Sequence, residues 1–230
     1  MAGFPGFPKD LFKFLRELKK NNNKTWFNDN KPRYLQSVVE PMIEFISVME
    51  EPLRKISPHF RVDTRRNGGS MFRIYRDTRF SKVKTPYKEN VGCQFRHEQG
   101  KDAHAPGFYV HLEPKNVFFG GGLWMPPNPE LHKIRQMIDV FPKSWETVIN
   151  DRKIKQRFGG VQGDGLSRPP QGFAKDHPYI EDLKRKSFYL MQEADESLVT
   201  SPKFIKEVEK SFQATAPMMK FLCRCLEVPY

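Results

Sequence analysis

The chain has 230 residues, of which 38% are hydrophobic and 29% are charged, and its formal net charge at pH 7 is +12. A sequence of this length and apolar content can bury a substantial core, and no apolar run approaches the ~18 residues that a membrane-spanning helix needs. These values exclude a membrane-spanning protein and favour a soluble chain that folds unaided and attracts anions.

The N-terminal part is predicted to be mostly helical. Residues 1–8 are rich in Gly, Pro and Phe and lack the apolar region of a secretory signal, so we expect a flexible lead-in there. Apolar side chains at helical spacing predict an amphipathic helix over residues 9–20, which ends at the Asn run 21–23. Residues 24–54 continue the pattern with two interrupting prolines, which predicts two or three helical pieces.

The middle of the chain changes to short segments rich in aromatic and β-branched residues, separated by Gly, Pro and Asn. This composition is typical of strands in a mostly antiparallel sheet. A hairpin is predicted to turn near Pro114 to Asn116, and the run Gly120 to Gly122 lets the backbone bend sharply or approach another group closely. The predicted strands cover residues 59–63, 70–76, 90–98, 108–114 and 116–124.

The C-terminal part returns to helical patterns. Helices are predicted over residues 128–141 and 144–158, and a connector rich in Gly and Pro then leads to a short helix that runs into a strand ending near residue 194. A terminal helix is predicted over residues 202–226. With no domain boundary visible, we expect residues 1–230 to form a single α+β domain, with a central sheet packed by N-terminal and C-terminal helices.

The candidate functional centre is the basic segment RIYRDTRFSKVKTPYK, from Arg73 to Lys88, which we call the signature segment. Arginine presents a flat fork suited to carboxylate or phosphate, and lysine adds a point charge. The arginines can serve one pocket only if the chain turns at Asp77, a residue that suits a turn. Two structural alternatives remain open, namely a solvated basic face and a buried ion-pair network around Asp77.

The signature segment resembles a widespread family of bacterial and fungal proteins of unknown function, whose defining pattern is R-x-x-R-D-x-R-F-x-x-x-K-x-P-Y-K. The chain matches this pattern without a gap, and the likeness extends over nearly its full length. The resemblance implies family membership and no particular activity. The nine matched positions are Arg73, Arg76, Asp77, Arg79, Phe80, Lys84, Pro86, Tyr87 and Lys88.

His111 is the other candidate for chemistry, because on the predicted strand 108–114 it shares a polar face with Tyr109 and Glu113. Such a face beside a cationic segment could be an acid/base site, although a histidine on a sheet is more often structural. No spacing of a metal site or a cofactor fingerprint is present, so no metal and no cofactor is expected. The three cysteines fit neither a disulfide framework nor a zinc site and are expected to be reduced.

Three functions follow from these features. The first is a cationic pocket that binds a small anionic ligand bearing phosphate or carboxylate, with or without catalysis. The second is a nucleic-acid-binding module, supported mainly by the pI of about 9.6, and the third is a scaffold in which the signature is structural. A cytoplasmic or nuclear location is expected, and the residues expected to bind the ligand are Arg73, Arg76, Asp77, Arg79, Lys84, Tyr87, Lys88 and His111.

Overall fold

The computed structural model describes residues 3–79, 81–100 and 104–230. Its framework is a four-stranded antiparallel sheet in the order β1-β2-β3-β4. The strands are β1 (Val91–Arg96), β2 (Gly107–Glu113), β3 (Asn116–Leu123) and β4 (Phe188–Ala194). Because helices precede and follow this sheet, the predicted α+β class is confirmed. The hairpin is also confirmed, since Glu113 pairs with Asn116 across the turn between β2 and β3.

The helices form three groups along the chain. Before the sheet come α1 (Asp10–Lys20), α2 (Lys24–Asp29), α3 (Lys31–Tyr34), the π-helix η1 (Leu35–Val39), α4 (Glu40–Val48) and α5 (Glu50–Ile56). Between β3 and β4 come α6 (Asn128–Val140), α7 (Pro142–Ile149), α8 (Arg152–Phe158) and α9 (Ile180–Leu183). After β4 come α10 (Glu196–Val199), α11 (Phe204–Ala214) and α12 (Ala216–Cys225). Among the described residues, no helix has the length and apolar content to cross a membrane.

Two of the predicted helices are each divided in the structure. The helix expected over residues 144–158 becomes α7 and α8, because the Asp151 carboxylate accepts a hydrogen bond from the backbone of Ile154 and caps a new helix. The terminal helix divides at Thr215, where Pro217 removes a backbone donor from the first turn of α12.

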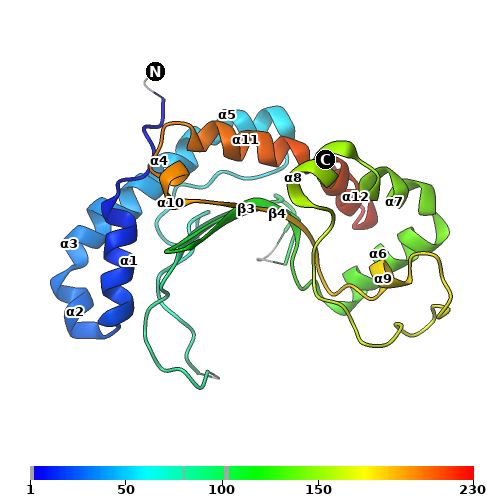
Figure 1. The fold of residues 1–230 in the computed structure, drawn as a ribbon, viewed down its shortest axis with the longest axis horizontal. Helices are drawn as coiled ribbons and strands as arrows, with labels where there is room; N and C mark the ends of the chain where they lie inside the picture. Colours follow the sequence, from blue (N-terminus) through cyan, green and yellow to red (C-terminus); the bar gives the residue numbers. More distant parts are fainter. Residues whose placement is uncertain (1–2, 80, 101–103) are drawn as a thin grey trace.

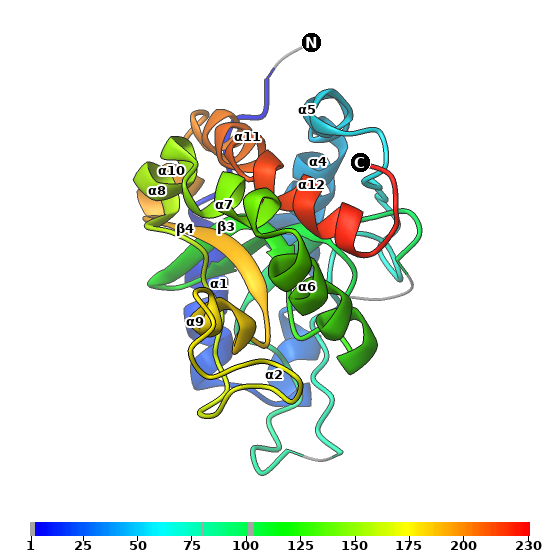
Figure 2. The same ribbon diagram turned by 90° about the vertical axis from the view of Figure 1, so that its right-hand side faces the viewer.

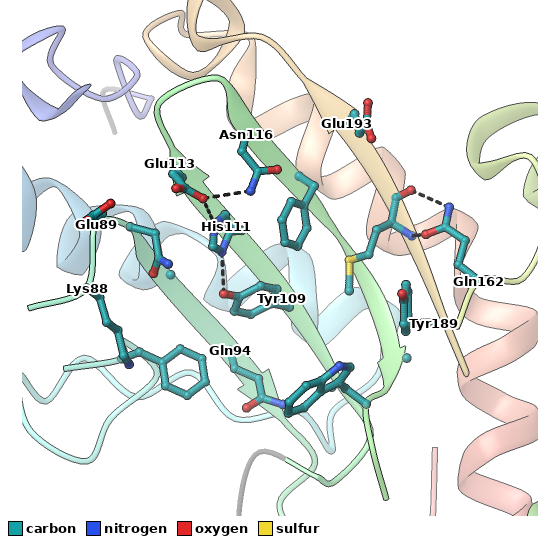
Figure 3. Close-up of a pocket in the computed structure, with 18 of the residues that line it drawn as sticks. Lys88, Glu89, Gln94, Tyr109, His111, Glu113, Asn116, Gln162, Tyr189 and Glu193 are labelled. Atoms are coloured by element: carbon teal, nitrogen blue, oxygen red, sulfur yellow. Dashed lines mark hydrogen bonds and ion pairs between the residues drawn. The ribbon is translucent and has the colours of Figure 1, made fainter. Parts of the chain in front are cut away.

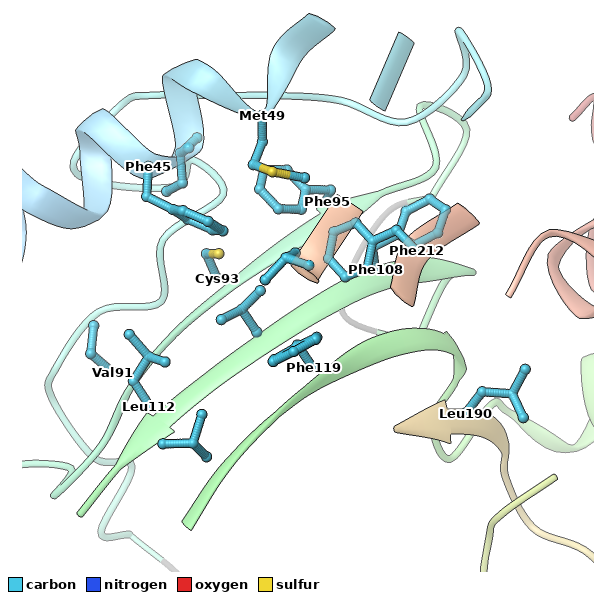
Figure 4. Packing of buried hydrophobic residues seen from close by; sticks show 14 of the residues in the cluster. Phe45, Met49, Val91, Cys93, Phe95, Phe108, Leu112, Phe119, Leu190 and Phe212 are labelled. Atoms are coloured by element: carbon cyan, nitrogen blue, oxygen red, sulfur yellow. The ribbon is translucent and has the colours of Figure 1, made fainter. Parts of the chain in front are cut away.

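One face of the sheet carries the core. In Figure 1, α4, α5 and α11 lie along this face, and in Figure 4 the side chains of Phe45 and Met49 lie above Cys93 and Phe95 of β1. Alternate residues of each strand point into this layer, because successive side chains of a strand project to opposite faces. The fully buried members from β1 to β4 include Cys93, Phe95, Phe108, Val110, Leu112, Phe119, Phe188 and Leu190.

The opposite face is bordered on two sides and left open between them (Figures 1 and 2). On one side lie α1 to α3 and the segment 72–90, which we call the arm. The arm folds back on itself, because the backbone N–H of Arg76 donates to Pro86 and that of Lys88 donates to Ile74, at 2.9 and 2.7 Å. On the other side lie α6, α9 and the connector that leads to β4.

Two of the predicted strands are not strands of the sheet. The segments 59–63 and 70–76 run beside β1 and its end. They make isolated bridges, between Phe60 and His97, which follows β1, and between Met71 and Cys93 of β1. Their aromatic and β-branched residues gave them the composition of strands, but isolated bridges do not make either segment a strand of the sheet.

The predicted lead-in is also corrected by the structure. Phe4 and Phe7 are 3% and 2% exposed, and both rings contact Phe45 of α4. The backbone N–H of Phe7 donates to the carbonyl of Val199 at 2.9 Å. Gly and Pro suggested a loose segment, but burial of two aromatic rings outweighs the entropy of ordering it.

Candidate functional site

A pocket of about 1110 Å³ lies on the open face of the sheet. Its floor is made by the side chains that point away from the core, so that core and pocket use alternate residues of the same strands. Figure 3 shows these side chains rising from β1, β2 and β4 toward the open space. The floor includes Gln94, Tyr109, His111, Glu113, Phe118, Tyr189, Met191 and Glu193.

The walls come from segments far apart in the sequence. The arm contributes Phe72, Arg76, Asp77, Lys88 and Glu89. Trp124 follows β3 on the opposite side, and Gln162 of the connector is held in place because its side-chain amide donates to the carbonyls of Phe158 and Met191, both at 3.1 Å. Residues from four strands, the arm and the connector therefore meet in one pocket.

Tyr109, His111 and Glu113 form a hydrogen-bonded line along β2 (Figure 3). The Tyr109 hydroxyl lies 2.9 Å from His111 Nδ1, and His111 Nε2 lies 3.3 Å from Glu113 Oε2. The Asn116 amide donates to the same carboxylate oxygen at 2.9 Å. The imidazole is 8% exposed and stacks on the Phe118 ring with 4.5 Å between centroids. We call these three residues of β2 the Tyr-His-Glu line.

The position of the proton on His111 follows from the hydrogen-bond acceptor that faces each ring nitrogen. An ionised carboxylate accepts hydrogen bonds only, so His111 Nε2 carries the proton that faces Glu113. Burial lowers the pKa of His111, with an opposing contribution from the hydrogen bond to Glu113, so the neutral ring is favoured near pH 7. Nδ1 of the neutral ring is then an acceptor, and the Tyr109 hydroxyl donates to it. Burial also raises the pKa of Tyr109.

Gly92 of β1 makes room for this arrangement. It pairs with His111 in the register of β1 and β2, and a Cβ at this position would lie 2.8 Å from the Tyr109 hydroxyl and 3.2 Å from a ring carbon. Any other residue would therefore collide with the end of the Tyr109 side chain. The glycine is required here by the close approach of a side chain, and not by an unusual backbone angle.

Lys88 is the most isolated cation of the pocket. Its ammonium lies 5.4 Å from the centroid of the Phe72 ring, and within the described part of the chain it forms no ion pair. Burial lowers the pKa of Lys88, and the nearby charge of Arg73 lowers it further. A half-buried ammonium without a counter-ion is poised to accept an anionic partner.

The lining of the pocket is not cationic. Among the described residues, the acidic side chains that line it outnumber the basic ones, which corrects the prediction of a cationic pocket. The acidic residues are Asp77, Glu89, Glu113 and Glu193, and the basic residues are Arg76 and Lys88. The reason is that four of the six basic residues of the signature segment are exposed and do not line the pocket, namely Arg73, Arg79, Lys82 and Lys84.

The structure brings four of the eight predicted site residues to the pocket, namely Arg76, Asp77, Lys88 and His111. Arg73, Arg79 and Lys84 are exposed and do not line it. Phe80 of the signature lies outside the described residues.

The other residues of the signature segment shape the arm. Arg79 donates to Asp77 at 2.6 Å, and this hydrogen bond lowers the pKa of Asp77 to about 2. Lys84 Nζ donates to the carbonyl of Thr78 at 2.9 Å, which joins two parts of the arm. Tyr87 is 3% exposed and stacks on Phe27 of α2, with 4.1 Å between ring centroids. These contacts give this part of the signature a role in shaping the arm, but the Asp77–Arg79 pair is exposed and is not the buried ion-pair network that was one of the alternatives.

Several pocket residues were not predicted as site residues. Gln94, Gln162, Tyr189 and Glu193 lie far apart in the sequence and meet only because β1 and β4 join the same sheet. A signal for part of this set was present, since residues 188–191 alternate between buried and pocket-facing side chains.

Metal ligands and reactive thiols do not gather in the described part of the chain. No group of three or more His, Cys, Asp or Glu side chains there could hold a metal ion. The three cysteines are free and buried, and burial raises the pKa of Cys223 and Cys225 to about 12. At neutral pH these thiols are protonated and weakly nucleophilic.

The family model of the conserved hypothetical proteins (DUF2461) matches residues 10–221. The match runs from the start of α1 into α12 and includes every residue that lines the pocket. No curated protein and no solved structure matches the chain.

Proposed function

Because the chain belongs to the conserved hypothetical proteins (DUF2461), a family whose description names no activity, we propose a function from the pocket itself. The pocket binds a small organic molecule that carries an acidic group, a carboxylate or a phosphate, together with ammonium or hydroxyl groups. The acidic group binds beside the arm, and the ammonium or hydroxyl groups bind beside the carboxylates of the floor.

The observation that carries this proposal is the distribution of unneutralised charge. Two carboxylates of the wall already have cationic partners, since Asp77 pairs with Arg79 and Glu89 pairs with Lys19. On the arm, Lys88 and Arg76 remain without an ion pair among the described residues, and Arg76 donates to the Thr85 hydroxyl at 2.8 Å. The arm therefore offers net positive charge to the pocket.

The floor offers the opposite sign. Glu193 pairs with no described cation, and the contacts of Glu113 are the neutral His111 and the Asn116 amide. In Figure 3, Lys88 and Glu193 lie on opposite sides of the floor. A ligand with charges of both signs complements this arrangement, whereas a simple anion meets two uncompensated carboxylates.

The remaining lining suits a ligand of this kind. Phe72, Phe118, Trp124 and Tyr189 offer apolar area, and the amides of Gln94 and Gln162 offer both donors and acceptors. The volume of about 1110 Å³ is slightly larger than the roughly 300–1,000 Å³ of most small-molecule sites.

The test measures thermal stability in the presence of small probes. Amino acids and amino-sugar phosphates are compared with acetate, inorganic phosphate and ethanolamine, each of which carries charge of one sign. A dipolar probe at ~100 times its Kd stabilises the protein by about 2.7 kcal/mol, which raises the Tm by roughly 5–10 °C for a chain of this size.

Lys88→Met and Glu193→Gln are each expected to remove most of this increase. Lys82→Met is the matched control, because Lys82 is an exposed lysine of the arm that does not line the pocket. No response to any probe, or an equal response in wild type and Lys88→Met, contradicts the proposal.

A further inference from the structure

We propose that the Tyr109 phenolic oxygen is a catalytic base. It removes a proton from a ligand bound over β2, while its own proton passes to His111 Nδ1. This inference rests on the proposed ligand pocket and extends it from binding to a reaction. His111 and Glu113 are positioning residues that act through Tyr109.

The direction of the hydrogen bonds supports this assignment. Asn116 and His111 both donate to Glu113 Oε2, so the line ends on a carboxylate that only accepts. This fixes the donor in each of the other hydrogen bonds. The Nε2–H of His111 donates to Glu113, so Nδ1 of His111 is an acceptor, and the Tyr109 hydroxyl donates to Nδ1. The proton of Tyr109 points along the line, so a lone pair of its oxygen faces the pocket.

The proton transfer balances without a further reactant. The ligand loses one proton to the Tyr109 oxygen, and the Tyr109 hydroxyl loses one proton to His111 Nδ1. Tyr109 stays neutral, His111 becomes an imidazolium, and the ligand gains one negative charge. Return of the proton along the same line to another atom of the ligand completes an isomerisation and restores the protein.

The surroundings favour a transient imidazolium more than a phenolate. The Glu113 carboxylate faces the ring that gains the charge, and the Phe118 face stacks on it. Glu193 adds negative charge from β4, against Lys88 and Arg76 on the arm, whereas Glu89 is paired with Lys19. Because burial raises the pKa of Tyr109, its oxygen is unreactive at neutral pH unless a neighbouring base takes its proton.

The same charges define the class of substrate. An acidic group held by Lys88 leaves the rest of the molecule over the floor, where Tyr109 lies between the arm and β4 (Figure 3). The atom that loses the proton there is either a hydroxyl or a carbon next to a carbonyl group, since these carry the protons that a side-chain base removes. The substrate is thus a small acid, or its phosphate analogue, that carries this reacting group together with the ammonium or hydroxyl groups of the proposed ligand.

The test measures the nucleophilicity of the Tyr109 oxygen with p-nitrophenyl acetate as the probe. The ester bond breaks and p-nitrophenolate leaves, the Tyr109 oxygen gains the acetyl group, and its proton passes to His111. Peptide mass spectrometry gives the acetylation rate of each tyrosine. Tyr189 is the internal control, because it lines the same pocket and forms no side-chain hydrogen bond with a described residue.

The pH profile decides the outcome. An unassisted tyrosine reacts as its phenolate, so its rate rises about tenfold per pH unit below pH ~10. The rate of Tyr109 is expected to be nearly constant between about pH 7.5 and 9, because it follows the neutral form of His111. A rate for Tyr109 that rises in parallel with that of Tyr189, or acetylation of Tyr189 alone, overturns the proposal.

Three variants separate this inference from ligand binding. Glu113→Gln keeps the size of the side chain and is expected to lower the plateau rate of Tyr109 about tenfold or more while the rate of Tyr189 is unchanged. Gly92→Ala displaces the Tyr109 hydroxyl and is expected to abolish the plateau. Lys82→Met, at an exposed lysine of the arm that does not line the pocket, leaves the plateau intact, so loss of the plateau in Glu113→Gln is not a general effect of changing a charged side chain. An unchanged plateau in Glu113→Gln and Gly92→Ala refutes the relay even if ligands bind as proposed.

Discussion

Replacing Tyr87 with alanine tests whether the signature segment is anchored by a buried ring. Tyr87 is 3% exposed and stacks on Phe27 at 4.1 Å and 24°, and the Asn22 side chain pairs with both its backbone N–H and its carbonyl. An aromatic side chain buries roughly 150–250 Å², which at ~25 cal/mol per Å² corresponds to about 4–6 kcal/mol of transfer free energy.

Partial collapse around the vacated site reduces that loss, and comparable truncations of buried aromatic residues cost about 3–5 kcal/mol. This is a large share of the ~5–15 kcal/mol by which proteins are stable. Tyr75→Ala is the matched control, because Tyr75 bridges to Tyr87 in the arm but is 52% exposed. Since half of its surface is already in water, its loss should be about half of that for Tyr87→Ala, roughly 2 kcal/mol.

The assay is urea unfolding followed by circular dichroism, with Tyr87→Phe as a second control that keeps the ring. A loss below about 1.5 kcal/mol in Tyr87→Ala, or a loss no larger than that of Tyr75→Ala, would refute the reasoning. In that event the arm is held by its backbone contacts, and the ring of Tyr87 contributes little to the fold.

Two further predictions concern charged groups outside the pocket. Arg135 is 9% exposed and donates to the carbonyls of Leu183 and Arg185 at the end of α9. Arg135→Met leaves these carbonyls without their donor and should lower the free energy of unfolding by about 1–3 kcal/mol, whereas no loss in urea unfolding contradicts this role. The hydrogen bond from Arg33 lowers the pKa of Asp10 from 3.8 to about 2. The stabilisation is complete above pH ~4 and is lost as the pH falls toward 2, so Asp10→Asn should flatten that part of the stability curve, and an unchanged acid profile argues against it.

The part of the fold that the sequence predicts well is the part governed by local periodicity. Side chains that alternate over residues 107–113 place Tyr109, His111 and Glu113 on one face, and the structure confirms that face. The amphipathic pattern of α1 is likewise a local signal. Each of these predictions needs only neighbours within a few residues.

The signature segment could not be interpreted in the same way. Its basic residues are close in sequence, but the arm folds back on itself. As a result, Arg79 donates to Asp77 and Lys84 donates to the carbonyl of Thr78. The charge of the pocket lining could not be predicted from the sequence either, because Glu193 reaches the pocket only through the pairing of β4 with β3. Charge counted along a chain does not give the charge of a cavity when tertiary contacts decide which side chains face it.

The alternation of the strands has a consequence for how this protein can change. Substitutions at Gln94, Tyr109, Tyr189 and Glu193 remove no member of the aromatic layer beneath them, so the chemistry of the open face can vary while the packing that stabilises the fold stays intact. An insertion or deletion of one residue within β2 has the opposite effect, since every residue on one side of the change would switch faces, which can turn His111 toward the core or Phe108 toward the pocket. Relatives of this chain are therefore expected to tolerate point substitutions on this face and to preserve the length of every strand.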